Sequence, residues 1–168
     1  FFPRDYAAAF RDLNQGRTVP ADPAFYVAAP GVSDPTLADD GRLGVFVLVP
    51  VPLLSRLGKV DWAAETDRVR ETVLRRLSAA GASLSVQGIL GETVWTPETW
   101  SRRFGLFQGS AFGAAHTLGQ MGPFRPANFS RRLRGLYFTG ASTTPGTGMP
   151  MVVLSGRLTA ERIQQDAR

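Results

Sequence analysis

The sequence predicts a fold that mixes helices and strands without strict alternation, so the protein is expected to be α/β with some α+β character. Apolar residues recur at helical spacing in several segments, and short runs rich in β-branched and aromatic residues lie between them. Glycine, proline and aspartate mark turns at the junctions. With 168 residues, of which 43% are hydrophobic, the chain can build one core.

Four helices are expected, at residues 5–13, 62–80, from 96 onward and 152–165. Asp61 is a suitable N-cap for the second helix, and Gly81 suits the left-handed position after its end. The pattern of that helix places Val69, Val73 and Leu77 on a packing face. Its arginines at 68, 75 and 76 are expected to face outward.

Strands are expected at residues 24–29, 44–49, 84–95 and 135–139. The 44–49 run lacks polar alternation, which is typical of a strand covered on both faces. The apolar stretch around this strand is about half as long as a bilayer span and is interrupted by Pro50 and Pro52, so we expect a buried strand and no membrane crossing.

Composition excludes several kinds of chemistry. The chain has no cysteine and a single histidine, His116, so disulfides, thiolate nucleophiles and ordinary zinc sites are not expected, and no metal is predicted. The net charge of +5 comes almost entirely from arginines scattered in twos and threes. Without a long basic run, nucleic acid is not an expected partner.

The glycine-rich loop at residues 140–150 is where we expect the chemistry, because it joins a predicted strand to the last helix. Gly146-Thr147-Gly148 begins like a dinucleotide fingerprint, but Met151 replaces its third glycine. A second interpretation is that the helix N-terminus faces the pyrimidine edge of a flavin, where reduction leaves negative charge. A third is a tight connection that binds no ligand.

The stretch from 109 to 163 resembles the C-terminal part of the bacterial-type phytoene desaturase and carotenoid desaturase family. The resemblance rests on GSAFG, Gln120, Arg125-Pro126 and GLYF-x-GAST-x-PG-x-G-x-P. Earlier segments resemble the substrate-domain landmarks of the same family, in the same order. These segments are FYVAAPGVSDPTLADDG, VFVLVPVP, Asp61-Trp62 and VWTPETW.

This resemblance implies an FAD-dependent oxidoreductase that desaturates a linear carotene such as phytoene, with a quinone or oxygen as electron acceptor. It implies a two-domain fold in which residues 1–108 belong to the substrate-binding domain and 109–168 return to the FAD-binding domain as its last strand and helix. The family's N-terminal G-x-G-x-x-G segment is not in this sequence. A missing N-terminal FAD-binding segment is therefore an expected partner, and the piece alone is expected to be inactive. The expected location is cytoplasmic, peripheral on a membrane surface.

The resemblance also assigns roles within the loop. Three residues are implied beside the ribityl or pyrophosphate part of FAD: Gly140, Ala141 and Ser142. Others are implied at the isoalloxazine edge, with the amides of the last two nearest its O2 atom: Gly148, Met149, Pro150, Met151 and Val152. Gly146 is implied to shape the turn before them.

Several assignments stay open. His116 is a candidate proton acceptor, although a histidine bonded inside the fold is the favoured interpretation. Arg125 is expected to anchor the loop more than to reach the cofactor. Five phenylalanines either line a carotene tunnel or pack in an ordinary core: Phe104, Phe107, Phe112, Phe124 and Phe129.

Alternative functions remain. One is another carotenoid-modifying flavoenzyme, such as a 3,4-desaturase, a ketolase or an isomerase. Another is a non-catalytic arginine-rich module that binds nucleic acid or an anionic membrane. Apolar faces left without their flavin half also predict self-association.

Overall fold

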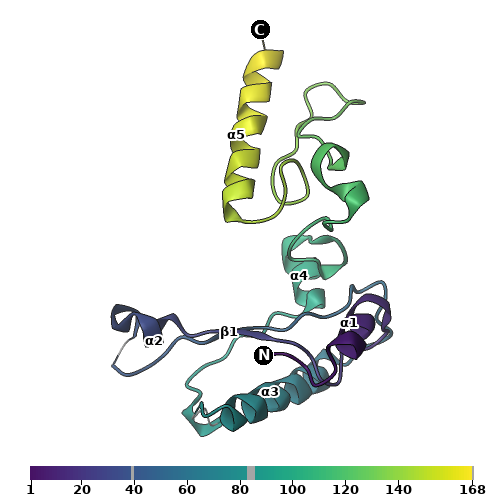
Figure 1. Cartoon of the computed structure of the whole chain (residues 1–168). Coiled ribbons are helices and arrows are strands. Elements are labelled where there is room, and N and C mark those ends of the chain that lie inside the picture. The colour runs from purple at the N-terminus through teal and green to yellow at the C-terminus, as the bar shows by residue number, and fades with distance from the viewer. Residues whose placement is uncertain (39, 83–85, 168) are drawn as a thin grey trace. The chain divides into compact units, whose positions relative to one another are not determined.

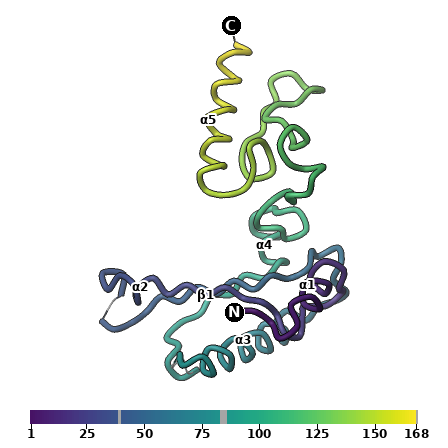
Figure 2. The backbone as a smooth tube through the Cα atoms, viewed as in Figure 1, coloured from purple at the N-terminus to yellow at the C-terminus, as the bar shows by residue number. Residues whose placement is uncertain are grey.

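The computed structural model describes residues 1–38, 40–82 and 86–167. The chain divides into two compact units, Phe1–Phe104 and Gly105–Arg168, which Figures 1 and 2 trace in chain order. This division lies close to the boundary expected from sequence. The assignment of the two parts to a substrate-binding and an FAD-binding domain stays a prediction.

The N-terminal unit combines helices with a small sheet. Its α-helices are α1 (Tyr6–Gln15), α2 (Pro30–Ser33), α3 (Trp62–Ala79) and α4 (Pro97–Phe104), its 3₁₀ helices are η1 (Pro35–Leu37) and η2 (Val86–Gly88), and its strands are β1 (Tyr26–Ala28) and β2 (Phe46–Leu48). Each helix predicted in this unit is therefore present, with bounds shifted by a few residues.

Strands β1 and β2 form an antiparallel two-stranded sheet in which Val27 pairs with Val47. Phe46 is 57% exposed and Val47 is 37% exposed. The prediction that this strand is covered on both faces is therefore wrong for this chain. The reason is that β1 is the only strand paired with it among the described residues, and a two-stranded ribbon has too little surface to enclose its own side chains.

Helix α3 supplies the core of this unit. Asp61 caps it, because its carboxylate accepts hydrogen bonds from the backbone N–H groups of Ala63 at 3.0 Å and Ala64 at 3.2 Å. Val73 and Leu77 are buried against Phe25, the residue that precedes β1. The predicted cap and packing face of α3 are both confirmed.

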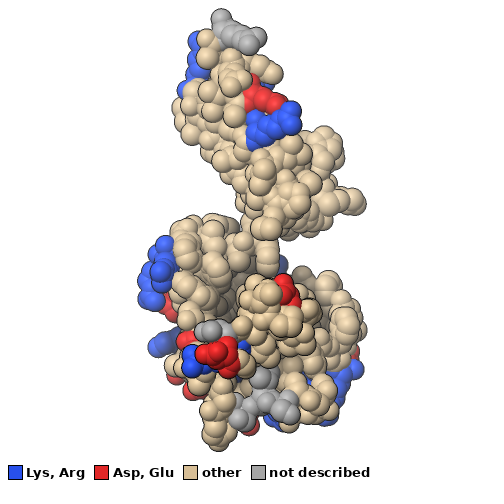
Figure 3. All heavy atoms as spheres, turned by 90° about the vertical axis from the view of Figure 1, so that its left-hand side faces the viewer, with Lys and Arg blue, Asp and Glu red and all other residues tan. Residues whose placement is uncertain are grey.

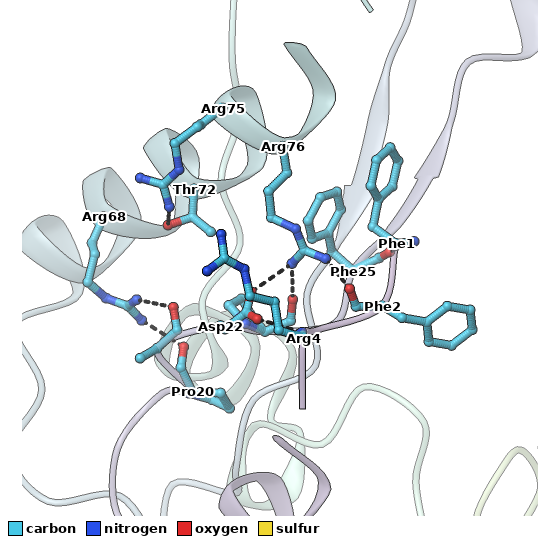
Figure 4. A network of polar contacts seen from close by, with 12 residues as sticks. Phe1, Phe2, Arg4, Pro20, Asp22, Phe25, Arg68, Thr72, Arg75 and Arg76 are labelled. Carbon is cyan, nitrogen blue, oxygen red and sulfur yellow. Dashed lines mark hydrogen bonds and ion pairs between the residues drawn. The ribbon is translucent and has the colours of Figure 1, made fainter. Parts of the chain in front are cut away.

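Two of the arginines expected to face outward instead hold the N-terminal segment on α3 (Figure 4). Arg76 donates to the Pro23 carbonyl at 2.7 Å and to the Asp22 carboxylate at 3.1 Å, and its guanidinium lies 4.7 Å from the ring centroid of Phe25. Arg68 donates to the Pro20 carbonyl at 3.0 Å. A long arginine side chain can satisfy several backbone acceptors at once, which helical periodicity alone does not reveal.

The C-terminal unit consists mainly of loops and one long helix. Its elements are the 3₁₀ helices η3 (Phe107–Gly109), η4 (Leu118–Gln120) and η5 (Gly122–Phe124), and helix α5 (Met149–Asp166). Helix α5 confirms the predicted final helix and begins before Val152. No described helix is both long and apolar enough to span a membrane.

Two predicted strands are absent from the described residues. The 135–139 segment forms only an isolated antiparallel bridge between Tyr137 and Phe129. Of the 84–95 segment, residues 84 and 85 lie outside the described residues, and the remainder begins with η2 and contains no strand. A run of β-prone residues becomes a strand only when a neighbouring strand takes up its backbone hydrogen bonds over several residues. In the described chain, the 135–139 segment bonds over a short stretch to residues 128–130, and residues 86–95 pair with no strand.

Candidate functional site

The loop from Gly140 to Gly148 has glycine at its conformationally demanding positions. Gly140, Gly146 and Gly148 have φ angles of 112°, 142° and 114°, which side-chain-bearing residues rarely adopt. A Cβ atom added at Gly140 or Gly148 would meet no atom within 4 Å. These two glycines therefore leave open space beside the backbone, while Gly146 is buried.

Helix α5 begins at the end of this loop with Gly148 as its N-cap residue. The Val152 N–H donates to the Gly148 carbonyl at 2.9 Å, so this amide is used by the helix itself. The N–H groups of Met149 and Met151 lie in the first turn, where a helix provides no acceptor, and Pro150 has no N–H. Of the two amides that the resemblance places nearest a flavin, only that of Met151 thus lacks a partner within the helix.

A buried group of polar side chains holds α5 against the loop. Ser155 is 0% exposed, and its Oγ accepts hydrogen bonds from the Gly140 N–H at 3.1 Å and the Asn128 side-chain amide at 3.0 Å. The Ser155 and Thr143 hydroxyls lie 2.9 Å apart. The Thr159 hydroxyl lies 2.8 Å from the Ser155 carbonyl and 3.0 Å from that of Phe138. We call Asn128, Thr143, Ser155 and Thr159 the polar core.

Helix α5 consequently turns hydroxyl groups inward and aliphatic groups outward. Ser155 and Thr159, one turn apart, are its buried residues, whereas Val153 is 74% exposed and Leu154 is also exposed. Sequence reasoning missed Ser155, Thr159 and Asn128 because a hydropathy pattern places aliphatic residues inside. Two hydroxyl residues four positions apart, among the aliphatic residues of the first half of this helix, are the sequence signal that points to them.

Arg125 is the second support of the loop and is 4% exposed. Among the described residues, its guanidinium donates to backbone carbonyl oxygens alone, those of Ala114, Ala115, Gln120, Ala141 and Thr143. The Nε–Thr143 and Nη1–Gln120 distances are 3.1 Å and 3.0 Å. The sequence expectation that Arg125 anchors the loop is confirmed.

Side chains of the loop join it further to the segment at 112–116. The Ser142 Oγ accepts from the Ala114 N–H at 3.2 Å, and the Thr147 hydroxyl donates to the Phe112 carbonyl at 2.8 Å. Ser142, expected beside FAD, therefore already has a protein partner. The loop and the 112–116 segment form one hydrogen-bonded assembly around Arg125.

His116 is exposed and lies beside Gly146, because a Cβ on that glycine would be 3.5 Å from the His116 Nε2. The interpretation of His116 as a histidine enclosed in the fold is therefore wrong, and its role as proton acceptor stays a prediction. The interpretation of the phenylalanines as ordinary core is also wrong for Phe104, Phe107, Phe112 and Phe124, which are all exposed. Their place in a carotene tunnel stays a prediction.

Charge is unevenly divided between the two units. The C-terminal unit contains seven arginines against two acids, Glu161 and Asp166, and so carries the chain's whole net charge of +5. Both acids form ion pairs on α5, with Arg157 at 2.7 Å and Arg162 at 3.0 Å. Most of this unit's surface in the view of Figure 3 is uncharged. The loop and its surroundings from 105 to 160 contain no acid at all.

The described residues contain no group of three or more histidine, cysteine, aspartate or glutamate side chains that could hold a metal ion. The open side of the loop presents glycine backbone, first-turn amides and apolar side chains, with His116 beside Gly146. This set of groups suits a flat organic ligand that develops negative charge at one edge.

Comparison with known proteins identifies the family. Residues 10–164 match the flavin containing amine oxidoreductases. The chain belongs to this flavoenzyme family. Its mixed helices and two-stranded sheet are accordingly a piece of the flavin-containing amine oxidoreductase fold. Membership in the family implies a flavin cofactor.

Curated relatives of this family member are carotenoid desaturases, which confirms the resemblance found in the sequence. The chain is 42% identical over 163 residues to a zeta-carotene-forming phytoene desaturase of Myxococcus xanthus, covering 96% of the chain and 31% of that relative. It is 36% identical over 168 residues to the 4,4'-diapophytoene desaturases (4,4'-diaponeurosporene-forming) of Staphylococcus aureus strains bovine RF122 / ET3-1 and MRSA252, covering 98% of the chain and 33% of each relative. The chain thus spans about a third of the length of these relatives, and corresponds to a C-terminal part of them.

The residues present in this family member fit a flavin. Gly140 and Gly148 each leave open space where a Cβ would stand, and Gly148 directly precedes the first-turn amides of Met149 and Met151. The absence of acids between residues 105 and 160 means that no nearby carboxylate of this unit opposes negative charge at that place.

Proposed function

We propose that this chain is the C-terminal part of an FAD-dependent carotenoid desaturase, which dehydrogenates a linear carotene such as phytoene. The observation that carries the proposal is the open, glycine-bearing face at the N-terminus of α5, in a chain that belongs to a flavoenzyme family. The similarity to phytoene and diapophytoene desaturases supports the choice of substrate class.

In this proposal, the new double bond forms by loss of a hydride from one carbon of the carotene and a proton from the next, and FAD, when bound, would supply the hydride acceptor. Gly148 allows the backbone to approach the isoalloxazine edge, and the Met151 amide with the positive end of the α5 dipole faces that edge. The Val152 N–H is already bonded to the Gly148 carbonyl, so in the proposal Val152 contributes its half-buried side chain and no free amide. Gly140, Ala141 and Ser142 border the ribityl or pyrophosphate part.

The apolar side chains at the start of α5 would bring the carotene to the flavin. Met149 is 82% exposed, and Met151 is exposed beside it. A carotene offers dispersion contacts and no hydrogen-bonding groups, so unbranched, polarisable methionine side chains suit it. The exposed phenylalanines Phe107, Phe112 and Phe124 extend this apolar lining in the proposal.

The same proposal assigns the remaining partners. Residues 1–108 belong to the substrate-binding domain, and an N-terminal segment of the full-length enzyme supplies the rest of the FAD site. The enzyme works in the cytoplasm at the surface of a membrane, where an apolar carotene is dissolved, and passes electrons to a quinone or oxygen. His116, exposed beside Gly146, is the candidate proton acceptor.

The first test uses the full-length protein that contains this chain. We expect the purified protein to show flavin absorbance and to convert phytoene in liposomes, with 4,4'-diapophytoene and lycopene supplied in parallel to define the substrate. A change of lycopene alone would favour a 3,4-desaturase, ketolase or isomerase. A properly folded protein that shows neither flavin absorbance nor activity on any of these carotenes would refute the proposal.

A matched pair of glycine variants then tests the loop itself. Gly148→Ala forces a side chain into a φ of 114°, so we expect reduced flavin content. Gly119→Ala is the control, since this exposed glycine also has open space around it and shows no left-handed φ. Equal flavin content in the two variants would argue against a flavin contact at Gly148.

A further inference from the structure

Arg125 is a buried cation with no carboxylate partner among residues 1–38, 40–82 and 86–167. It is 4% exposed, and in the described part of the chain it forms no ion pair, because all its hydrogen-bond acceptors are neutral carbonyl oxygens. Carbonyl oxygens compensate for lost hydration but leave the positive charge unneutralised. The two acids of the unit, Glu161 and Asp166, are paired with other arginines.

The position of Arg125 links this charge to the loop. Its guanidinium bonds the carbonyls of Ala141 and Thr143, and a Cβ on Gly146 would lie 3.6 Å from its Nε. In a trans peptide the N–H points opposite to the carbonyl. Drawing the Ala141 carbonyl inward therefore turns the N–H of Ser142 away from the guanidinium, toward the other side of the loop.

We propose that Arg125 positions the flavin-contacting loop, and that its unneutralised charge favours the reduced, negatively charged form of the flavin. This inference rests on the proposed function. A single guanidinium fork ties the 114–120 segment to the 141–143 segment, and so holds the turn that leads through Gly146 into α5. A lysine has the charge but lacks the planar fork that binds several carbonyls at once.

The electrostatic half of the proposal follows from burial. Water and salt screen an enclosed charge less than an exposed one, so the field of Arg125 reaches the loop with little loss. It has the same sign as the N-terminal end of the α5 dipole. Both fields favour electron uptake by a flavin held against residues 146–152.

The test compares Arg125→Met, Arg125→Lys and Arg132→Met in the full-length flavoprotein. Arg132→Met is the matched control, because Arg132 is exposed and its removal changes the net charge equally. FAD affinity is measured by titrating the apoprotein, and the flavin midpoint potential by equilibration with reference dyes. Thermal unfolding of each variant reports whether it is folded.

Loss of the fork should raise the Kd for FAD by about tenfold or more in both Arg125 variants. The midpoint potential should fall in Arg125→Met and stay near that of the parent in Arg125→Lys, because only the lysine keeps the charge. Arg132→Met should change neither quantity. A pure packing role would lower stability without this separation between lysine and methionine.

Three outcomes would overturn the inference while leaving the proposed function intact, provided that the parent protein binds flavin. One is an FAD Kd within twofold of the parent in a folded Arg125→Lys protein. Another is an unchanged potential in a folded Arg125→Met protein. The third is failure of both Arg125 variants to fold beside a folded Arg132→Met, which would make Arg125 a support of the whole unit. A parent protein that binds no flavin would instead refute the proposed function.

Discussion

Ser155 uses every hydrogen-bonding capacity of its hydroxyl inside the C-terminal unit. It accepts from the Gly140 N–H and the Asn128 amide and lies within hydrogen-bond distance of the Thr143 hydroxyl. One small side chain thus joins α5, the loop and the segment before it. Its removal would leave the half-buried Gly140 N–H without this acceptor, which costs more than the lost bond itself. The Asn128 amide would lose one of several acceptors and keep the Thr144 carbonyl and the Thr159 hydroxyl.

We therefore expect Ser155→Ala to lower the free energy of unfolding by about 1–3 kcal/mol. Ser55→Ala, at an exposed position of the other unit, is the control and should change it little. Urea denaturation of the full-length protein provides the measurement. Hydrogen exchange should locate the loss at residues 138–159, and protection there equal to that of the parent would contradict the expectation.

The Tyr137 hydroxyl donates a 2.9 Å hydrogen bond to the Asp166 carboxylate at the end of α5. The hydrogen bond from Arg162, followed by that from Tyr137, lowers the pKa of Asp166 below its ordinary 3.8. The bond to Asp166 in turn raises the pKa of Tyr137 above its ordinary 10.0. Because the pKa of Asp166 is lowered, its contribution to stability is complete above pH 3.8 and disappears as the pH falls through the folded-state pKa.

The same linkage applies at the alkaline end with the opposite sign. The raised pKa of Tyr137 means that its contribution to stability is complete below pH 10.0 and disappears as the pH rises through the folded-state pKa.

We expect NMR titration to give an Asp166 pKa below 3.8 that returns toward 3.8 in Arg162→Met. Arg157→Met is the matched control on the same helix and should leave it unchanged.

For single residues, prediction from sequence was most reliable where the residue type and its position together suggest one specific hydrogen-bonding role. The N-cap role of Asp61 and the anchoring role of Arg125 were both foreseeable, because an acid before a helix and an arginine beside a proline-rich loop suggest specific hydrogen bonds. The burial of Ser155 and Thr159 was not foreseen. Their burial depends on acceptors and donors from residues 128 to 144, which lie far away in sequence.

At the scale of elements, α3 shows how local signals and packing agree. The Asp61 carboxylate satisfies two first-turn N–H groups, while Leu77 and Val73 pack on Phe25. The helices of this chain could be predicted well because caps, periodicity and stop residues all lie within each segment. The strands could be predicted only in part, since a strand depends on a partner that sequence does not specify. The predictions at 24–29 and 44–49 are confirmed by β1 and β2, whereas the 135–139 segment and the described part of 84–95 form no strand.

We expect Asp61→Ala to destabilise α3 by about 1 kcal/mol, because two first-turn amides lose their acceptor. Glu71→Ala is the control, an exposed acid in the same helix. Hydrogen exchange at the amides of Ala63 and Ala64 is the measurement. If those amides exchange no faster in Asp61→Ala than in Glu71→Ala, the cap contributes nothing.

At the scale of the whole molecule, the chain exposes many large apolar side chains. They occur in both units and include Tyr26, Phe46, Leu90, Phe107, Leu118 and Met149. Where such side chains adjoin one another in an apolar patch, the patch usually meets a partner. The chain spans about a third of its relatives, which carry twice as much further sequence with which such surfaces could pack.

Produced alone, this chain is therefore expected to self-associate and to bind the dye ANS, whereas the full-length protein should bind far less dye per molecule. Light scattering coupled to size-exclusion chromatography gives the mass, and fluorescence titration gives the dye binding. Repeating both in high salt is the control, since association through apolar surface persists when charges are screened. A monomer with little dye binding would contradict this expectation, because it would mean that the exposed apolar side chains need no partner in solution.

The inward-facing hydroxyl groups of α5 imply that the same substitution has opposite effects in the protein and in a short peptide. An isolated peptide of residues 149–166 has no loop or Asn128 to bond, so its helicity depends on intrinsic propensity alone. Alanine favours a helix more than serine does, and Ser155→Ala should make the free peptide more helical. In the folded chain the identical change removes the hydroxyl that accepts from the Gly140 N–H and contributes one acceptor to Asn128. Serine at this position therefore lowers the intrinsic helix propensity of α5 but supplies hydrogen bonds that hold the folded C-terminal unit together.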